Sequence, residues 1–416
     1  MMPLYSLKSS NLFLACLIFY VCIVKLEAAA EPDQVIEFFR HGARTPRSNY
    51  DKQWSKSELK QLTPFGMVQQ YNLGKTLAAR YPNLIASGYS PDDVYVLSDT
   101  SPRCIESAMV QLSSIFRGKT STLLENPQQE LQDNLTAKFT PLLSSDEANR
   151  GDFIPVKVDV VEPNSEDQLI FAGRDPKFCP TLGKYQNESR MSTEMSQGWR
   201  IFQDPVQEAN FYLPDRQKIK NMDNLYWAHD AFNSDKYANR TLPGGITDED
   251  LIESLNYGQA YYQYILEERL DIQKELTSFN VLKAIMDSME NFRQGKNSKK
   301  LVFLSGHDIN IIAVLSAFGI MSAECLLANY RDYKLGEDPS YPSCQFPEFA
   351  SNLIFEFYNH TTNPSVKFYY NDVLVPLCGE EESCSYDDFV NLIRTSSGNN
   401  NLVTWNEKCG SNLVFF

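Results

Sequence analysis

The feature that most constrains the fold of this chain is an alternation of short apolar runs and helical patterns in its first and last thirds. Residues 35–39, VIEFF, are apolar, partly β-branched and aromatic, which is typical of a short buried strand. Residues 93–99 predict a second strand, and residues 299–308 predict another. A helical pattern follows each of these runs. The alternation predicts an α/β fold with a mostly parallel central sheet flanked by helices.

Two of the predicted helices carry clear start signals. Thr63 is a favourable N-cap and Pro64 suits the first helical position, ahead of apolar residues at helical spacing that end at Pro82. Residues 101–116 repeat the arrangement, with a serine followed by a proline at the start. Residues 153–163, FIPVKVDVVEP, predict a third strand.

The middle of the chain has a different character, because residues 164–297 are mostly polar and helical and show no strong strand pattern. Strand patterns return after this segment, and two further strands are predicted at 352–359 and 365–375. With 416 residues the chain exceeds the usual size of one compact core. We therefore predict an α/β core formed by residues 31–163 and 298–416, with 164–297 inserted as a mainly helical cap.

Residues 1–30 have the pattern of a secretory signal peptide. Lys8 provides a weak positive n-region, an unbroken apolar run occupies residues 12–24, and three alanines at 28–30 offer small residues for cleavage. The alternative is a single-span anchor, but the apolar run is too short for a bilayer. No later segment is apolar enough to span a membrane after cleavage of the signal.

Other features agree with export to the lumen or the exterior. Asn-x-Ser/Thr sequons predict glycosylation at Asn134, Asn187, Asn239 and Asn359. The formal net charge of −15 argues against nucleic acid or an anionic membrane as a partner. An acidic surface also suits a protein that must stay soluble in an acidic compartment. We therefore predict a secreted or lysosomal protein.

The cysteines support the same compartment. Nine are present, and Cys16 and Cys22 belong to the predicted signal peptide. Most of the remaining seven should pair in an oxidising environment, and the odd number leaves at least one free. We predict that Cys104 is free, because it lies in a helix that reads as buried. The absence of Cys-x-x-Cys spacing and the small number of histidines argue against a zinc site.

Charged residues and histidines follow three of the predicted strands. Arg40 and His41 come directly after the first strand, Arg103 follows the second, and His307 and Asp308 follow the strand after the insertion. Ligands of parallel α/β sheets bind at the carboxyl ends of the strands. The sequence therefore predicts that these side chains meet at one edge of the sheet.

This set of side chains suits the chemistry of a phosphoryl group. Arginines, including Arg44, present planar forks that match phosphate oxygens, although arginines at a strand end can also simply pair with carboxylates. A neutral imidazole such as His41 can attack phosphorus to give a phosphohistidine. A second histidine can donate a hydrogen bond to a phosphoryl oxygen, and Asp308 can donate a proton to the leaving alcohol.

Several motifs resemble those of a known family. RHGARTP, residues 40–46, resembles the RHGxRxP signature of the histidine acid phosphatases, branch 2 of the histidine phosphatase superfamily. LSGHDINI resembles the second family motif, LTPFG its Leu-Thr-x-x-Gly helix, and LSDTSPRCIESA the segment with its third phosphate-binding arginine. YPSC and PLCGEEESC are similar to the cysteine loops of animal lysosomal and prostatic acid phosphatases. The resemblance covers nearly all of the chain after the signal peptide.

The resemblance implies a role for each matched residue. His41 would be the nucleophile and Asp308 the proton donor, while the phosphoryl group would be held by Arg40, Arg44, Arg103 and His307. The implied fold is phosphoglycerate mutase-like, an α/β core with a smaller helical cap. The implied substrates are small phosphomonoesters, no metal or cofactor is needed, and a homodimer is possible because animal relatives form dimers.

The resemblance also bears on the disulfides and on two other histidines. Cys179–Cys409 and Cys378–Cys384 resemble family pairings, whereas the cap offers no clear partner for Cys344, which leaves a local Cys325–Cys344 bridge. A second His-Asp pair, His229-Asp230, does not follow an apolar strand, and we interpret it as structural or as a surface feature. His360 lies within a sequon and is expected to be exposed.

Three alternative functions remain open. A phytase shares both motifs but generally needs several basic residues around a highly anionic substrate, whereas this chain is acidic. The phosphoglycerate mutase branch typically has Arg-His-Gly-Glu, and Ala43 and the signal peptide argue against it. A non-catalytic glycoprotein that binds a phosphate ligand would typically have lost the nucleophile or the donor. We predict an acid phosphatase of broad substrate range.

Overall fold

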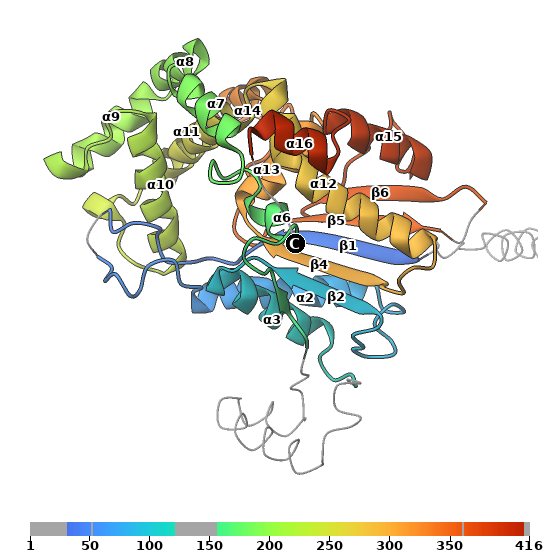
Figure 1. The fold of residues 1–416 in the computed structure, drawn as a ribbon. Coiled ribbons are helices and arrows are strands. Elements are labelled where there is room, and N and C mark those ends of the chain that lie inside the picture. The colour runs from blue at the N-terminus through green and yellow to red at the C-terminus, as the bar shows by residue number, and fades with distance from the viewer. Residues whose placement is uncertain (1–30, 51–52, 121–155, 360–361, 412–416) are drawn as a thin grey trace, which may run out of the picture.

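The computed structural model describes residues 31–50, 53–120, 156–359 and 362–411. One sheet with helices on both faces dominates the described chain (Figure 1). Its strands are β1 (Gln34–Arg40), β2 (Val94–Ser98), β3 (Asp159–Val160), β4 (Leu301–Gly306), β5 (Asn352–Tyr358), β6 (Ser365–Tyr370), β7 (Val373–Leu374) and β8 (Cys384–Ser385). The predicted α/β class with a central sheet is confirmed.

The sheet is parallel in one half and antiparallel in the other, whereas the sequence analysis expects a mostly parallel sheet. The strand order is β3-β2-β4-β1-β5-β6-β7, with β8 paired to β6. The pairs among β1, β2, β3 and β4 are parallel, as predicted. From β5 onward the pairs are antiparallel. The connection from β5 to β6 is too short for the crossover that a parallel pair requires, so these two strands run in opposite directions.

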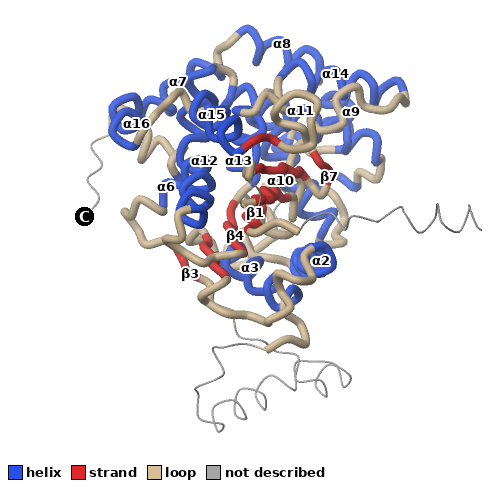
Figure 2. The backbone as a smooth tube through the Cα atoms, turned by 90° about the vertical axis from the view of Figure 1, so that its right-hand side faces the viewer, coloured by secondary structure: helices blue, strands red, loops and turns tan. Residues whose placement is uncertain are grey.

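Strand β1 lies in the middle of the sheet and is buried along its whole length. Ile36 and Phe38 belong to one apolar cluster, while Val35 and Phe39 belong to a cluster on the opposite face. Alternate side chains of a strand point to opposite faces, so each face must be covered by helices. Figure 2 shows α2 and α3 on one side of the strands and α12 and α13 on the other.

The register of the parallel strands brings their carboxyl ends level with one another. Arg40, the last residue of β1, lies opposite Gly306, the last residue of β4. Ser98, the last residue of β2, lies opposite Ser305. The residues that follow β1, β2 and β4 therefore leave the sheet at the same edge.

Helices α2 (Pro64–Arg80) and α3 (Pro102–Ile115) begin where the sequence predicts. The Thr63 side chain caps α2 by accepting a hydrogen bond from the backbone N–H of Gly66. The two helices pack so closely that a Cβ atom at Gly74 would lie only 2.4 Å from the carbonyl oxygen of Gln111. Glycine at this position lets α2 and α3 cover one face of the sheet together.

The third strand is much shorter than predicted. Residues 151–155 lie outside the described part of the chain, and only Asp159–Val160 form β3. It is an edge strand beside β2. The backbone N–H of Lys157 donates to the Tyr89 hydroxyl oxygen instead of to a neighbouring strand. A side chain therefore takes the bond that would have extended the ladder.

The predicted insertion consists of helices. They are α6 (Gln168–Ala172), α7 (Pro180–Arg190), α8 (Thr193–Ile201), α9 (Gln203–Tyr212), α10 (Met222–Tyr237), α11 (Glu249–Glu268) and α12 (Asp271–Arg293). Helices α7 to α11 lie to one side of the sheet, whereas α12 lies over the sheet (Figure 1). The helices that α12 packs against include α13 (Asp308–Ala317) and α15 (Tyr386–Ser396). The division into core and cap at 164–297 stays a prediction.

Three disulfides are present in the described chain. They join Cys179 to Cys409, Cys325 to Cys344 and Cys378 to Cys384, the pairs that the sequence analysis gives. Cys104 is free and buried. Two helices that the sequence analysis did not predict carry half-cystines, α14 (Ala323–Leu335) with Cys325 and α16 (Leu402–Cys409) with Cys409.

Some predictions concern residues that the structure does not describe. The signal peptide at 1–30, the Asn134 sequon and His360 lie outside the described ranges. Asn187 and Asn239 are exposed, and Asn359 is partly exposed. Among the described helices, none combines the length and the apolar character that a membrane span requires.

Candidate active site

The ends of β1, β2 and β4 converge on one cavity of about 380 Å³. Five of the six residues predicted to act on a phosphoryl group contribute to its lining: His41, Arg44, Arg103, His307 and Asp308. The sixth, Arg40, lies directly behind it, with its Nη2 atom 2.9 Å from a carboxylate oxygen of Asp308. The structure therefore brings together all six side chains, which come from three separate strand ends.

The loop that carries His41 is held against the start of α2. A Cβ atom at Gly42 would lie 2.2 Å from the carbonyl oxygen of Gly66, and one at Gly66 would lie 2.2 Å from that of Ala43. The backbone N–H of Gly42 also donates to the hydroxyl of Ser107 at 3.1 Å. Both glycines are needed for this close approach, which explains why each belongs to its motif.

His41 is buried and is held in one tautomer. Its Nδ1 atom lies 2.8 Å from the carbonyl oxygen of Gly42. Because a carbonyl can only accept, Nδ1 carries the proton and Nε2 carries a free lone pair. Burial lowers the pKa of His41 well below its usual value, and the nearby charges of Arg103 and His307 lower it further. The imidazole is therefore neutral and nucleophilic at Nε2.

Arg40 and Arg44 are held rigidly by the protein. Arg40 donates to the carbonyl oxygen of Pro347 at 2.6 Å and lies over the ring of Phe349. Arg44 forms an ion pair of 2.7 Å with Asp230. Both guanidinium groups are almost fully buried, so their orientation is fixed before any ligand binds.

Arg103 has no carboxylate partner within the described chain. Burial lowers its pKa, and the neighbouring guanidinium groups of Arg44 and Arg47 lower it further. The Nε atoms of Arg40, Arg44 and Arg103 are all buried without a hydrogen-bond acceptor in the described structure. Buried cationic donors of this kind suit an anion with several oxygen atoms.

Asp308 lies at the first position of α13, beside the arginines. Burial acts to raise its pKa, but the charges of Arg40 and Arg47 outweigh that effect and lower the pKa to about 2. The carboxyl group is therefore ionised at neutral pH.

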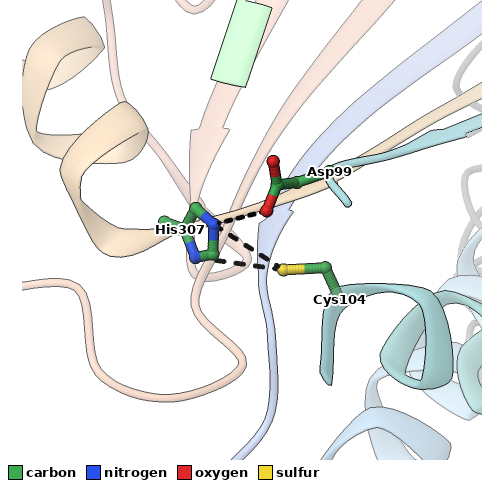
Figure 3. Close-up of side chains that lie close together, drawn as sticks. All are labelled: Asp99, Cys104 and His307. Atoms are coloured by element: carbon green, nitrogen blue, oxygen red, sulfur yellow. Dashed lines mark hydrogen bonds and ion pairs between the residues drawn. The ribbon is translucent and has the colours of Figure 1, made fainter. Parts of the chain in front are cut away.

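Asp99 is a site residue that sequence reasoning missed. Its Oδ2 atom lies 2.9 Å from Nε2 of His307 (Figure 3). It is the first residue after β2, so the strand-end rule that selected Arg103 also applies to it. Cys104 Sγ lies beside the same ring, 3.9 Å from Nδ1 of His307.

The side chains of Asp99, Cys104 and His307 also offer a carboxylate, a thiol and an imidazole whose ligand atoms lie within 4.8 Å of one another. Such a set can hold a metal ion. However, Arg44, Arg47 and Arg103 line the same cavity, and their positive charge opposes a cation. We therefore interpret the three side chains as a hydrogen-bonded support for the His307 ring.

The His229-Asp230 pair is not a surface feature. His229 is buried, and the side chain of Asp230 is only 8% exposed. Asp230 binds the Arg44 guanidinium and, at 2.7 Å, the backbone N–H of Arg47. The pair belongs to α10, so a helix of the insertion fixes an arginine of the core. No local sequence signal indicates this contact, because it joins residues 186 positions apart.

Other residues of the insertion form the opposite wall of the cavity. Arg174 donates to the Glu267 carboxylate and to the carbonyl oxygen of Ile309. Asp175 and Gln186 lie on the same wall. The insertion also contributes the apolar residues Phe171, Ala172 and Pro176 to the lining. The charge of Arg174 is balanced by the Glu267 carboxylate.

Comparison with known proteins identifies the family of this chain. The model of the histidine phosphatase superfamily (branch 2) matches residues 33–371. The chain belongs to this family. The prediction from the motif at residues 40–46 is thus confirmed.

Named relatives in the family are acid phosphatases. Prostatic acid phosphatase of Bos taurus is 24% identical over 373 residues, covering 85% of this chain and 82% of the relative. Lysosomal acid phosphatase of Xenopus laevis is 24% identical over 412 residues, covering 93% of this chain and 80% of the relative.

Solved structures of phytases share the fold. The phytase from D. castellii aligns with a TM-score of 0.60 at 14% identity, covering 92% of this chain and 82% of the phytase. The Klebsiella sp ASR1 phytase aligns with a TM-score of 0.61 at 12% identity, covering 92% of this chain and 98% of the phytase. At these identities the likeness concerns the fold alone.

Proposed function

We propose that this chain is an acid phosphatase that hydrolyses orthophosphate monoesters through a phosphohistidine at His41. The observation that carries the proposal is the neutral imidazole of His41, whose Nε2 atom has a free lone pair. Near it, the Nε atoms of Arg40, Arg44 and Arg103 are buried without a hydrogen-bond acceptor in the described structure. Anionic repulsion normally keeps nucleophiles away from a phosphate ester. The arginines offset that repulsion, and a neutral nucleophile adds none.

In the first step, Nε2 of His41 attacks phosphorus and the bond to the ester oxygen breaks. Asp308, in its protonated form, donates a proton to the departing oxygen, so an alcohol leaves instead of an alkoxide. Arg40, Arg44 and Arg103 hold the phosphoryl oxygens throughout. The bond formed is N–P, and the bond broken is O–P.

In the second step, water replaces His41 on phosphorus. The Asp308 carboxylate takes a proton from the water, the water oxygen bonds to phosphorus, and the N–P bond breaks. Inorganic phosphate leaves, and both side chains return to their starting states. One aspartate thus serves as acid and then as base.

The low pKa of Asp308 accounts for an acidic working range. Without substrate, Arg40 and Arg47 keep the carboxyl ionised, with a pKa of about 2. A bound phosphoryl dianion neutralises these arginines, which raises the pKa of Asp308 and favours the protonated donor. Acidic pH favours the same form, so we expect higher activity at pH 4–6 than at pH 8.

The charge of the cavity favours simple monoesters over phytate. Its lining contains four arginines, at 44, 47, 103 and 174, and four carboxylates, at 99, 175, 267 and 308. Glu267 is paired with Arg174, but the Asp175 carboxylate would repel the further phosphates of an inositol polyphosphate. We therefore infer a broad range of monophosphate esters, with phytate as a poor substrate.

The test is hydrolysis of p-nitrophenyl phosphate and of phytate from pH 3 to pH 8, with His41→Ala as the paired variant. We expect acid-optimal activity that needs no added metal and that falls at least about a thousandfold in His41→Ala. A well-folded wild type without activity would favour the non-catalytic binding protein. A higher kcat/KM for phytate than for the aryl ester would favour the phytase.

The cellular setting belongs to the same proposal. The signal pattern at 1–30 and the accessible sequons at Asn187 and Asn239 support a secreted or lysosomal glycoprotein. Two relatives named as lysosomal acid phosphatases agree with it. A mass shift on treatment with an N-glycosidase would test glycosylation. A homodimer stays a prediction, which the sedimentation coefficient of the purified protein would test.

A further inference from the structure

We propose that Asp99 is a positioning residue that holds His307 as an imidazolium, so that His307 donates a hydrogen bond to the phosphoryl group. The inference rests on the proposed phosphoryl site and adds a residue to it. His307 and Asp99 both line the cavity, and their side chains are only 16% and 11% exposed. Figure 3 shows the carboxylate directed at the ring.

Asp99 is itself fixed from two sides. Its backbone N–H donates to the carbonyl oxygen of Ser305 at 3.0 Å, which ties it to the end of β4. Its Oδ2 atom accepts the backbone N–H of Ser101 at 3.1 Å, just before the start of α3. The carboxylate therefore has little freedom to turn away from His307.

The hydrogen bond determines which protons His307 can offer. A carboxylate only accepts, so Nε2 of His307 carries a proton that is used in the bond to Asp99. In the neutral ring, Nδ1 then has a lone pair, which would repel a phosphoryl oxygen. His307 can donate to the phosphoryl group while keeping Asp99 only if Nδ1 is also protonated.

The groups around His307 oppose one another. Burial and the Arg103 charge lower the pKa of His307, and although Asp99 and Asp308 act to raise it, the pKa stays below its usual value in the protein alone. A bound phosphoryl dianion adds negative charge beside the ring and, together with Asp99, favours the imidazolium. The His41 ring lies edge-on, with its centroid 5.5 Å from that of His307. Cys104 packs beside the ring as a neutral thiol, because burial raises its pKa. Asp99 thus contacts the His307 ring directly, and its negative charge can offset the positive charge of the His307 imidazolium.

The test is the pH profile of Asp99→Asn. Asparagine keeps the shape and an acceptor oxygen but removes the charge, so the protonated form of His307 is lost at lower pH. We expect the alkaline limb of kcat/KM for p-nitrophenyl phosphate to move to lower pH by about one unit or more. The inhibition constant of inorganic phosphate at pH 6 should rise roughly tenfold with it.

Two controls separate this role from a structural or general electrostatic one. Asp175→Asn removes a charge from the same cavity without touching His307, and its alkaline limb should stay in place. In a His307→Gln background, adding Asp99→Asn should have no further effect on phosphate inhibition. A folded Asp99→Asn that loses activity equally at every pH, or an equal shift in Asp175→Asn, would overturn the proposal.

The role of Asp99 can also be tested by phosphate binding alone, without measuring catalysis. Calorimetric titration with inorganic phosphate from pH 5 to pH 8 measures whether affinity falls at lower pH in Asp99→Asn than in the wild type. If the wild type binds phosphate but hydrolyses nothing, the acid phosphatase proposal fails and the positioning role is still decided. If Asp99→Asn does not fold, an undiminished phosphate affinity of wild-type protein at pH 8 would contradict the need for an imidazolium.

Discussion

At the scale of single residues, one hydrogen bond decides which atom of His41 can react. The Gly42 carbonyl takes the Nδ1 proton and leaves Nε2 free, while burial keeps the ring neutral. The motif indicates which histidine reacts, but the backbone carbonyl of the next residue decides which tautomer His41 adopts. The same reasoning applies to His307, whose Nε2 proton is held by Asp99.

The donor role of Asp308 leads to a prediction about leaving groups. Asp308→Asn removes the transferable proton but keeps the size of the side chain. We expect kcat for an alkyl ester such as glycerol 2-phosphate to fall about a hundredfold to ten-thousandfold. An aryl ester, whose phenolate leaves without help, should lose much less. Equal losses for both esters in steady-state assays would argue against the donor role.

At the scale of elements, β1 combines a buried position with an acidic residue at its centre. Glu37 accepts hydrogen bonds from the side chains of Asn352, at 2.7 Å, and Gln111. Burial nevertheless raises the pKa of Glu37 from 4.5 to about 8. The carboxyl group is therefore neutral in the folded protein under acidic conditions.

This raised pKa predicts that stability falls as pH increases. Between pH 4.5 and pH 8 the unfolded chain releases the Glu37 proton and the folded chain keeps it, so this group disfavours folding by up to about 1.4 kcal/mol per pH unit. Glu37→Gln should remove that contribution. Thermal unfolding should show its advantage over the wild type growing from pH 5 to pH 8, whereas Glu208→Gln, on the exposed side of α9, should show none.

At the scale of the whole molecule, one disulfide joins distant parts of the chain. Cys179, just before α7 in the insertion, pairs with Cys409 at the end of α16, a sequence separation of 230. Cys378 and Cys384 are separated by only 6. A disulfide that closes a longer loop restricts the unfolded chain more strongly.

Removing these disulfides should therefore have unequal effects. Replacing Cys179 and Cys409 together by serine should lower the free energy of unfolding by about 5 kcal/mol, against about 2 kcal/mol for Cys378 and Cys384. Denaturant titration of both double variants beside the wild type measures the difference. Equal losses would mean that chain entropy does not govern the stability of this fold.

The sequence by itself determined the features that depend on local patterns. Apolar periodicity located β1, β2 and β4, and Thr63 marked the start of α2. The strand-end rule and the RHGARTP motif selected the six residues that the structure brings together around one cavity. These features could be predicted because strand ends of a parallel sheet meet wherever their register aligns.

Only the tertiary structure decided which groups support that set. Asp99 meets His307 across 208 positions, and Asp230 meets Arg44 across 186. The two-residue length of β3 likewise depends on the Tyr89 side chain, which binds a backbone group 68 positions away. Such contacts leave no local trace in the sequence, because a hydrogen bond between distant residues depends on how complete elements pack and not on the residues beside either partner.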